Sequence, residues 1–154
     1  MRKLVLPLLF LLAACGSSQP DNGTRSVPGH GAISVEIVPN PVVARRISGD
    51  TYEVPFEVVV RETGGSRVEI TRVSATAALP GGLSFDIESW DAARIRSMGY
   101  QTTVPANGEL RYRFSPRQEV PEAVFGGVTA KLLVEGRDAS GTATSATTTV
   151  SVTR

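Results

Sequence analysis

Apolar side chains recur at every second position between Tyr52 and Val60, in the stretch YEVPFEVVV. Successive side chains of a β-strand point to opposite faces, so this period predicts a strand with one buried face. The same period returns in segments 33–37, 73–79, 83–87 and 110–114, while no stretch has the period and length of a long helix. The chain is therefore predicted to be all-β.

Two further strands are expected over 128–134 and 142–152, which gives seven to eight strands separated by turns rich in Gly, Pro and Asn. Such a series predicts an antiparallel two-sheet sandwich over residues 32–154, with a small barrel as the alternative architecture. A break in phase at Thr71 and Arg72 predicts a β-bulge. The apolar phase predicts a core that includes Phe56, Val58, Ile70, Phe85, Tyr112, Phe114, Leu132 and Val150.

Prolines interrupt the first two strands. Pro39-Asn40-Pro41 ends the first alternating stretch, and Pro55 falls inside the second. Proline has no backbone N–H to donate to a sheet ladder. We therefore expect the chain to cross from one sheet to the other at 39–41, and we expect Pro55 to lie at a gap in strand pairing.

The closing stretch VTAKLLVEGRDASGTATSATTTVSV resembles the final hairpin of bacterial immunoglobulin-like or fibronectin-III-like domains. The resemblance covers about 33–154 and implies an immunoglobulin-like sandwich. The sequence has no cysteine pair and no tryptophan in the strand that carries the core tryptophan of antibody domains. The antibody branch is therefore excluded, and the looser sandwich superfamily remains.

The N-terminus has the three parts of a secretory signal: Arg2 and Lys3, an uncharged run over 4–12, and two alanines. The run is about half of the roughly 20 apolar residues that span a bilayer. Leu12-Ala13-Ala14-Cys15 resembles the lipobox of bacterial lipoproteins. This resemblance implies that 1–14 is a signal peptide and that Cys15 carries lipid, including an acyl group such as palmitate, and anchors the protein in the cell envelope. Because Gly16 is not Asp, it also implies the outer membrane in a host with two membranes.

Residues 15–31 are predicted to form the lipidated cysteine and a flexible tether, because GSSQPDNGTRSVPGHG has almost no aliphatic side chains. His30, the only histidine, falls in this tether and is expected to be solvent-exposed. With the lone Cys15 assigned to the anchor, no thiol or structured histidine remains for nucleophilic catalysis or zinc binding. No cofactor, no metal and no enzymatic activity are predicted.

The charge pattern gives no sign of a nucleic-acid partner. The chain has 16 basic and 15 acidic residues, for a net charge of +1, and its arginines are scattered. A nucleic-acid interface needs a clustered basic face. The expected partners are the membrane, through Cys15, and another envelope protein or polymer.

The region from Ser89 to Gly108 does not alternate. Asp91 is expected to cap a short helix that Gly99 ends. Two interpretations of its large side chains stay open. Trp90 can simply close one end of the core, or Trp90 and Tyr100 can stay partly exposed and anchor a partner.

Three carboxylates, Asp86, Glu88 and Asp91, precede Arg94 and Arg96. They are expected to be solvated or ion-paired, with a calcium site and a catalytic pair as alternatives. The sequence thus predicts a non-enzymatic binding or structural module of the envelope. The alternative is a sugar-binding or hydrolytic domain that uses the Asp86 to Tyr100 region.

Overall fold

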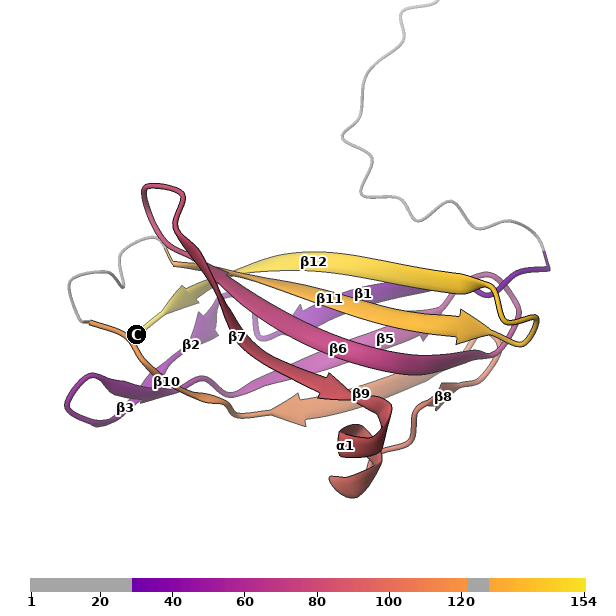
Figure 1. Cartoon of the computed structure of the whole chain (residues 1–154), viewed down its shortest axis with the longest axis horizontal. Coiled ribbons are helices and arrows are strands. Elements are labelled where there is room, and N and C mark those ends of the chain that lie inside the picture. Colours follow the sequence, from indigo (N-terminus) through magenta and orange to yellow (C-terminus); the bar gives the residue numbers. More distant parts are fainter. Residues whose placement is uncertain (1–28, 122–127) are drawn as a thin grey trace, which may run out of the picture.

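The computed structural model describes residues 29–121 and 128–154, and most of them lie in strands (Figure 1). The strands are β1 (Ile33–Val38), β2 (Val42–Val43), β3 (Arg45–Ser48), β4 (Thr51–Glu53), β5 (Phe56–Glu62), β6 (Val68–Ala78), β7 (Ser84–Asp91), β8 (Thr103–Val104), β9 (Glu109–Phe114), β10 (Arg117–Glu119), β11 (Thr129–Asp138) and β12 (Ala143–Thr153), and the helix is α1 (Ala92–Ser97). The prediction of a mostly β chain is confirmed.

The strands form three hydrogen-bonded sheets. One has the order β1-β5-β9, a second the order β10-β4-β3, and the six-stranded sheet the order β2-β12-β11-β6-β7 with β8 paired to β6. All pairs are antiparallel except β2 with β12. Figure 1 shows the β1-β5-β9 sheet lying across the six-stranded sheet, while β3 and β10 lie at one end of the long axis.

The number of strands and sheets differs from the seven to eight strands in two sheets that the sequence predicts. The additional strands β2, β3, β4, β8 and β10 are two to four residues long. Alternation over so few residues cannot be distinguished from chance, so these pieces were not visible as strands in the sequence.

The chain changes sheets at Pro39–Pro41, as expected. Before the prolines, β1 pairs with β5, and after them β2 pairs with β12 of the six-stranded sheet. Pro55 lies between β4 and β5, outside both ladders, where the neighbouring Val54 N–H bonds to the carbonyl of Pro116. Both proline expectations are confirmed.

The predicted bulge is also present. Arg72 pairs with Glu135 and Ile70 with Gly136, so Thr71 has no partner in the β6–β11 ladder. Gly136 is required there, because a Cβ at this position would lie 2.7 Å from Val68 Cγ1 and 2.8 Å from the Glu69 carbonyl oxygen.

The main core lies between the β1-β5-β9 sheet and the six-stranded sheet. It contains buried residues from both, including Ile33, Val58 and Tyr112 on one side and Ile70 and Leu132 on the other. A smaller cluster beside β4 and β10 contains Ala44, Tyr52, Val120, Val128 and Val152.

The core prediction is confirmed for Val58, Ile70, Tyr112, Phe114, Leu132 and Val150, which are buried. Phe56 and Phe85 are only half-buried. Phe56 is the first residue of β5, at the edge of the core, and Phe85 lies near the tip of the β6–β7 hairpin, which projects beyond the body of the domain (Figure 1).

The predicted signal peptide, Cys15 and the tether up to residue 28 lie outside the described residues, as do residues 122–127. Within the described parts of the chain, no helix is long and apolar enough to cross a membrane.

Candidate functional site

Trp90 belongs to the core. Its side chain comes from the inward phase of β7, it is 3% exposed, and its indole ring stacks on Phe114 with centroids 4.0 Å apart. Of the two interpretations of this residue, the structure supports the closure of the core. The expectation that Trp90 is exposed to a partner is wrong, because the inward phase of β7 faces β9 across the core.

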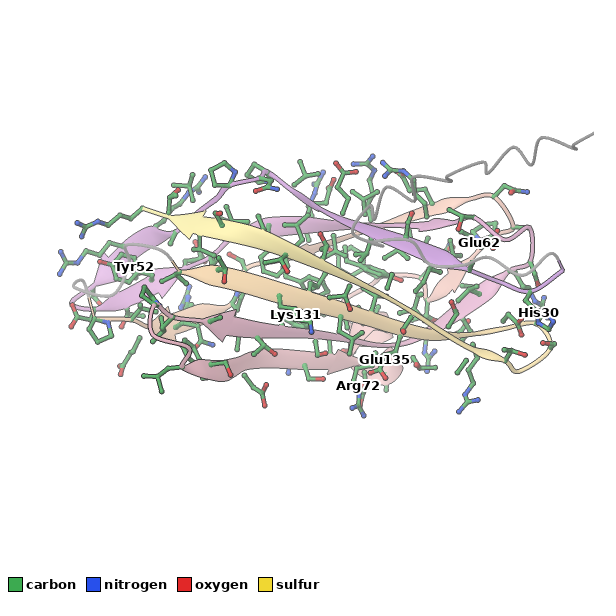
Figure 2. All side chains as sticks on the ribbon, turned by 90° about the horizontal axis from the view of Figure 1, so that it is seen from above. His30, Tyr52, Glu62, Arg72, Lys131 and Glu135 are labelled. Atoms are coloured by element: carbon green, nitrogen blue, oxygen red, sulfur yellow. The ribbon has the colours of Figure 1, made fainter. Side chains whose placement is uncertain are left out.

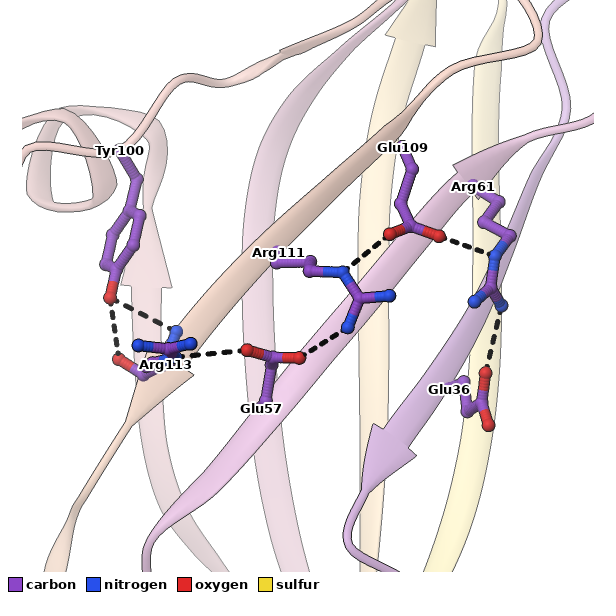
Figure 3. Close-up of polar contacts among 7 residues, drawn as sticks. All are labelled: Glu36, Glu57, Arg61, Tyr100, Glu109, Arg111 and Arg113. Atoms are coloured by element: carbon purple, nitrogen blue, oxygen red, sulfur yellow. Dashed lines mark hydrogen bonds and ion pairs between the residues drawn. The ribbon is translucent and has the colours of Figure 1, made fainter.

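Tyr100 lies at the edge of β9. Its hydroxyl accepts a hydrogen bond from the Arg113 N–H at 3.2 Å and donates one to the Arg113 carbonyl at 3.3 Å, and its ring meets Tyr112 edge-on at 5.6 Å (Figure 3). Tyr100 is half-buried. Its hydroxyl therefore hydrogen-bonds the backbone N–H and carbonyl of Arg113 on the edge strand β9. Tyr100 and Trp90 do not form an exposed aromatic pair.

Asp86, Glu88 and Asp91 do not converge. Asp86 accepts a hydrogen bond from Thr76, Glu88 pairs with Arg94, and Asp91 caps α1 by accepting from the Arg94 N–H at 2.8 Å. Across the described ranges, no group of three His, Cys, Asp or Glu side chains is placed to hold a metal ion. The expectation of solvated or ion-paired carboxylates is confirmed, with Glu88 ion-paired and Asp86 and Asp91 exposed, and so is that of a capped helix.

An open groove lies where β1 ends and β5 begins. We call it the proline groove; its volume is about 550 Å³, and its lining is Val38, Pro39, Val43, Arg45, Pro55, Phe56, Glu57, Arg113, Phe114 and Ser115. Val38 is 40% and Val43 48% exposed, so apolar surface faces solvent here. Its size lies within the range of ligand sites, although such sites usually enclose their ligands more fully.

A row of ion pairs covers the outer face of the β1-β5-β9 sheet beside this groove (Figure 3). We call it the charged stripe; in order, its members are Glu36, Arg61, Glu109, Arg111, Glu57 and Arg113, joined by contacts of 2.9, 2.7, 2.6, 2.6 and 3.1 Å. Hydrogen bonds from Arg111 and Arg113 hold the pKa of the Glu57 carboxyl below its usual range. The negative charge of Glu57, which belongs to both the charged stripe and the groove lining, is thus balanced by Arg111 and Arg113.

The charged stripe also shields an apolar residue. Val59 lies on the outer phase of β5, between Glu36 on β1 and Arg111 on β9, yet it is 0% exposed. Arginine side chains can lay their methylene stems over apolar surface while the guanidinium stays in water. The stripe is therefore a cover for this sheet as well as a set of ion pairs.

Two buried carboxylates hold the start of the domain. The Glu62 carboxylate accepts the backbone N–H groups of Gly64 (2.6 Å), Asn107 (2.8 Å), Gly65 (3.0 Å) and Ala32 (3.2 Å). Burial raises the pKa of Glu62, but these four hydrogen bonds outweigh it and lower the pKa overall. The carboxylate therefore stays ionised and fixes three loops at one end of the domain.

Asp138 fixes the preceding residues. Its carboxylate accepts hydrogen bonds from the Ser140 hydroxyl at 2.6 Å and the Gly31 N–H at 3.1 Å, and it lies 3.3 Å from His30 Nδ1. The Ser140 bond and backbone N–H groups hold the pKa of Asp138 well below its usual range. The last residues of the predicted tether thus contact the domain, and His30 is exposed, as expected.

A cavity between the sheets is too small to serve as a ligand site. It is entirely apolar, its volume is about 50 Å³, and its lining includes Ile37, Ala75, Ile87, Leu132 and Val150. Ligand pockets have volumes of about 300 Å³ or more. The proline groove is therefore the best candidate site among the described residues.

Sequence reasoning missed this groove. The available signal was the cluster of prolines at 39, 41 and 55, which mark strand ends, together with VVARRIS, where Val43 and Arg45 share one phase. The sequence does not indicate that the end of β9, almost 60 residues after Pro55, completes the lining of the groove.

No protein-family model matches the chain, and no curated protein matches it. The chain is similar in structure to the putative ApaA protein from Bordetella pertussis, with a TM-score of 0.57 and 11% identity over 83% of this chain and 99% of that one. It is also similar to a Northeast Structural Genomics Consortium target, with a TM-score of 0.55 and 10% identity over 82% of this chain and 89% of that one. At such identities the likeness concerns the fold alone.

Proposed function

We propose that this chain is a lipid-anchored lipoprotein of the bacterial envelope and a non-enzymatic binding module for another envelope protein or polymer. The apolar groove that opens to solvent at Val38 and Val43 carries the binding part of the proposal. Exposed apolar surface rimmed by charge is characteristic of interaction sites. The motif Leu12-Ala13-Ala14-Cys15 supports the anchor, and Gly16 in place of Asp supports the outer membrane in a two-membrane host.

The proposal includes an immunoglobulin-like two-sheet sandwich as the finer description of the fold. One layer is β1-β5-β9, the other is the six-stranded sheet, and β3, β4 and β10 extend the sandwich at one end. The single core cluster shared by the two larger sheets supports this description. The change of sheet between β1 and β2 supports it as well.

No observation favours the alternative of a sugar-binding or hydrolytic domain at Asp86 to Tyr100. Trp90, which would stack on a sugar ring, is buried, and Glu88 and Asp91 are engaged by Arg94 and by the first turn of α1. The region is accounted for by packing and capping.

Membrane fractionation tests the anchor. Cys15→Ser is expected to move the protein from the membrane to the soluble fraction while its thermal melt stays unchanged, because Cys15 lies well before β1. A matched variant, Cys15→Ser with Ser145→Cys, restores a thiol at an exposed strand position and is expected to stay soluble. A Cys15→Ser protein that still pellets with membranes after its mass shows signal cleavage would contradict lipid anchoring.

Crosslinking in native envelopes tests the binding role. A photo-crosslinker at Val43 is expected to capture a defined envelope protein or polymer, whereas the same group at Ser145, on β12, is expected to capture none. Equal capture at both positions would contradict a binding role for the groove.

A further inference from the structure

One strand face beside the proline groove combines exposed apolar surface with a free positive charge. Along 42–45, Val42 and Ala44 are buried, while Val43 and Arg45 are exposed and line the groove. Ile47, two residues further along β3, is also 48% exposed. This short segment therefore presents apolar side chains on either side of a guanidinium group.

The Arg45 guanidinium has no ion-pair partner in the described part of the chain. Its cross-strand neighbour, Glu53, instead lies 3.9 Å from Arg117. The only carboxylate in the groove lining belongs to Glu57, which is bound by Arg111 and Arg113. The groove thus holds a surplus positive charge that its own side chains do not neutralise.

The lining also limits the kind of molecule that fits. Val38, Pro39, Pro55 and Phe56 give the groove an apolar lining, and the groove is open to solvent. Small-molecule sites bury 70% or more of the surface of their ligand. A fatty acyl chain in this open groove would instead keep much of its surface in water, so the groove is a poor fit for it. An extended polypeptide needs only alternate side chains buried, because the others point away.

We infer that the proline groove binds an extended segment of a partner protein in which an apolar side chain and an acidic side chain stand two residues apart. The apolar side chain packs beside Val38 and Val43, and the carboxylate meets Arg45. This inference rests on the proposed binding role and specifies the chemistry of the partner. Recognition is through side chains, because Pro39 and Pro55 offer no backbone N–H in the groove.

Peptide titration followed by NMR tests the inference, using the full-length Cys15→Ser chain so that no lipid is attached. The probe is the peptide Thr-Leu-Thr-Glu-Thr-Leu-Thr with blocked ends, and the second probe has Lys in place of Glu. The Glu peptide is expected to shift the amide signals of Val43, Arg45 and Ser115 and to leave those of Gly64 and Ser140, at the other end of the domain, unchanged.

Charge reversal supplies the decisive comparison. Arg45→Glu is expected to weaken the binding of the Glu peptide at least tenfold and to strengthen the binding of the Lys peptide. Arg72→Glu, which makes the same change at an exposed position on β6, is expected to alter neither. Unchanged Gly64 and Ser140 signals show that each variant is folded.

Three results would overturn the inference: equal binding of both peptides to the unmutated groove, no shift of the groove amides at millimolar peptide, or shifts caused by dodecanoate and by neither peptide. The last result would assign the groove to a lipid. None of these results bears on membrane anchoring. If the Arg45→Glu protein still captures an envelope partner, the proposed binding role stands, but the proline groove is not the surface that performs it.

Discussion

The indole ring of Trp90 stacks on the ring of Phe114, so that an edge strand of the six-stranded sheet and an edge strand of the β1-β5-β9 sheet meet through two aromatic side chains. Phe114 also contacts Phe56 and Tyr112, with centroids 5.7 and 6.1 Å away. This aromatic row closes the side of the domain on which β7 and β9 have no further strand neighbour.

Trp90→Ala is expected to lower the free energy of unfolding by about 3 to 5 kcal/mol, because it removes a large buried ring and leaves a cavity. That is a large share of the roughly 5 to 15 kcal/mol that such a domain has. Trp90→Phe is expected to recover part of the loss. Urea unfolding measures both, and an unchanged midpoint for Trp90→Ala would contradict the packing described.

Tyr112→Phe is expected to leave the free energy of unfolding unchanged or to raise it by up to about 1 kcal/mol. The Tyr112 hydroxyl is buried and has no hydrogen-bond partner in the described ranges, and burial raises its pKa. Removing an unsatisfied polar group removes a desolvation cost. Tyr100→Phe is the contrasting variant: it loses both contacts with Arg113 and is expected to melt at a lower temperature.

Arg111→Ala is expected to lower the melting temperature of the protein, and Arg111→Met is expected to recover most of that loss. Exposed ion pairs contribute little each, whereas the arginine stem shields Val59. If Arg111→Met were as unstable as Arg111→Ala, the ion pairs of Arg111, and not the shielding of Val59 by its methylene stem, would be the source of stability. Thermal melts at low and high salt separate the two contributions.

Glu62→Gln is expected to lower the free energy of unfolding by about 1 to 3 kcal/mol at pH 7, since an amide cannot accept all four backbone hydrogen bonds. The pKa of Glu62 is lowered in the folded state, so the unfolded state binds more protons near pH 4. The stability from this group is present above the unfolded pKa of about 4.3 and is lost as the pH falls through the lower folded value.

A series of urea unfolding curves from pH 7 to pH 3 measures this effect. The unmutated protein is expected to lose stability on acidification more steeply than Glu62→Gln. Glu119→Gln, which removes a carboxylate at an exposed position, is the control and is expected to follow the unmutated curve. Identical slopes for all three proteins would contradict the role of Glu62.

Local signals in the sequence predicted local structure well. The cap of α1 by Asp91, its end before Gly99, the change of sheet at Pro39–Pro41 and the bulge at Thr71 each depend on a few neighbouring residues whose backbone preferences are strong. Proline, glycine and a capping aspartate restrict the backbone wherever they occur.

Contacts between distant residues could not be predicted in the same way. His30 lies beside Asp138, 108 residues later, and nothing near either residue indicates the other. Trp90 was open to two interpretations because its strand had a bulge at Ile87, which changes the phase and hides which face Trp90 takes. The proline groove depends on the ends of β1, β2, β3, β5 and β9 coming together, which only the topology determines.

The junction that holds His30 and Gly31 has a mechanical consequence. His30 and the β3–β4 hairpin, where Tyr52 lies, are at opposite ends of the long axis (Figure 2). Tension between the N-terminus and a partner held at Arg45 would be carried by the backbone of residues 30–45 itself, because both points of attachment lie on this one segment, whose longest strand, β1, is already extended. Such a load would not pass through β5, so the six register pairs of β1 with β5 and the core beneath them would not have to bear it.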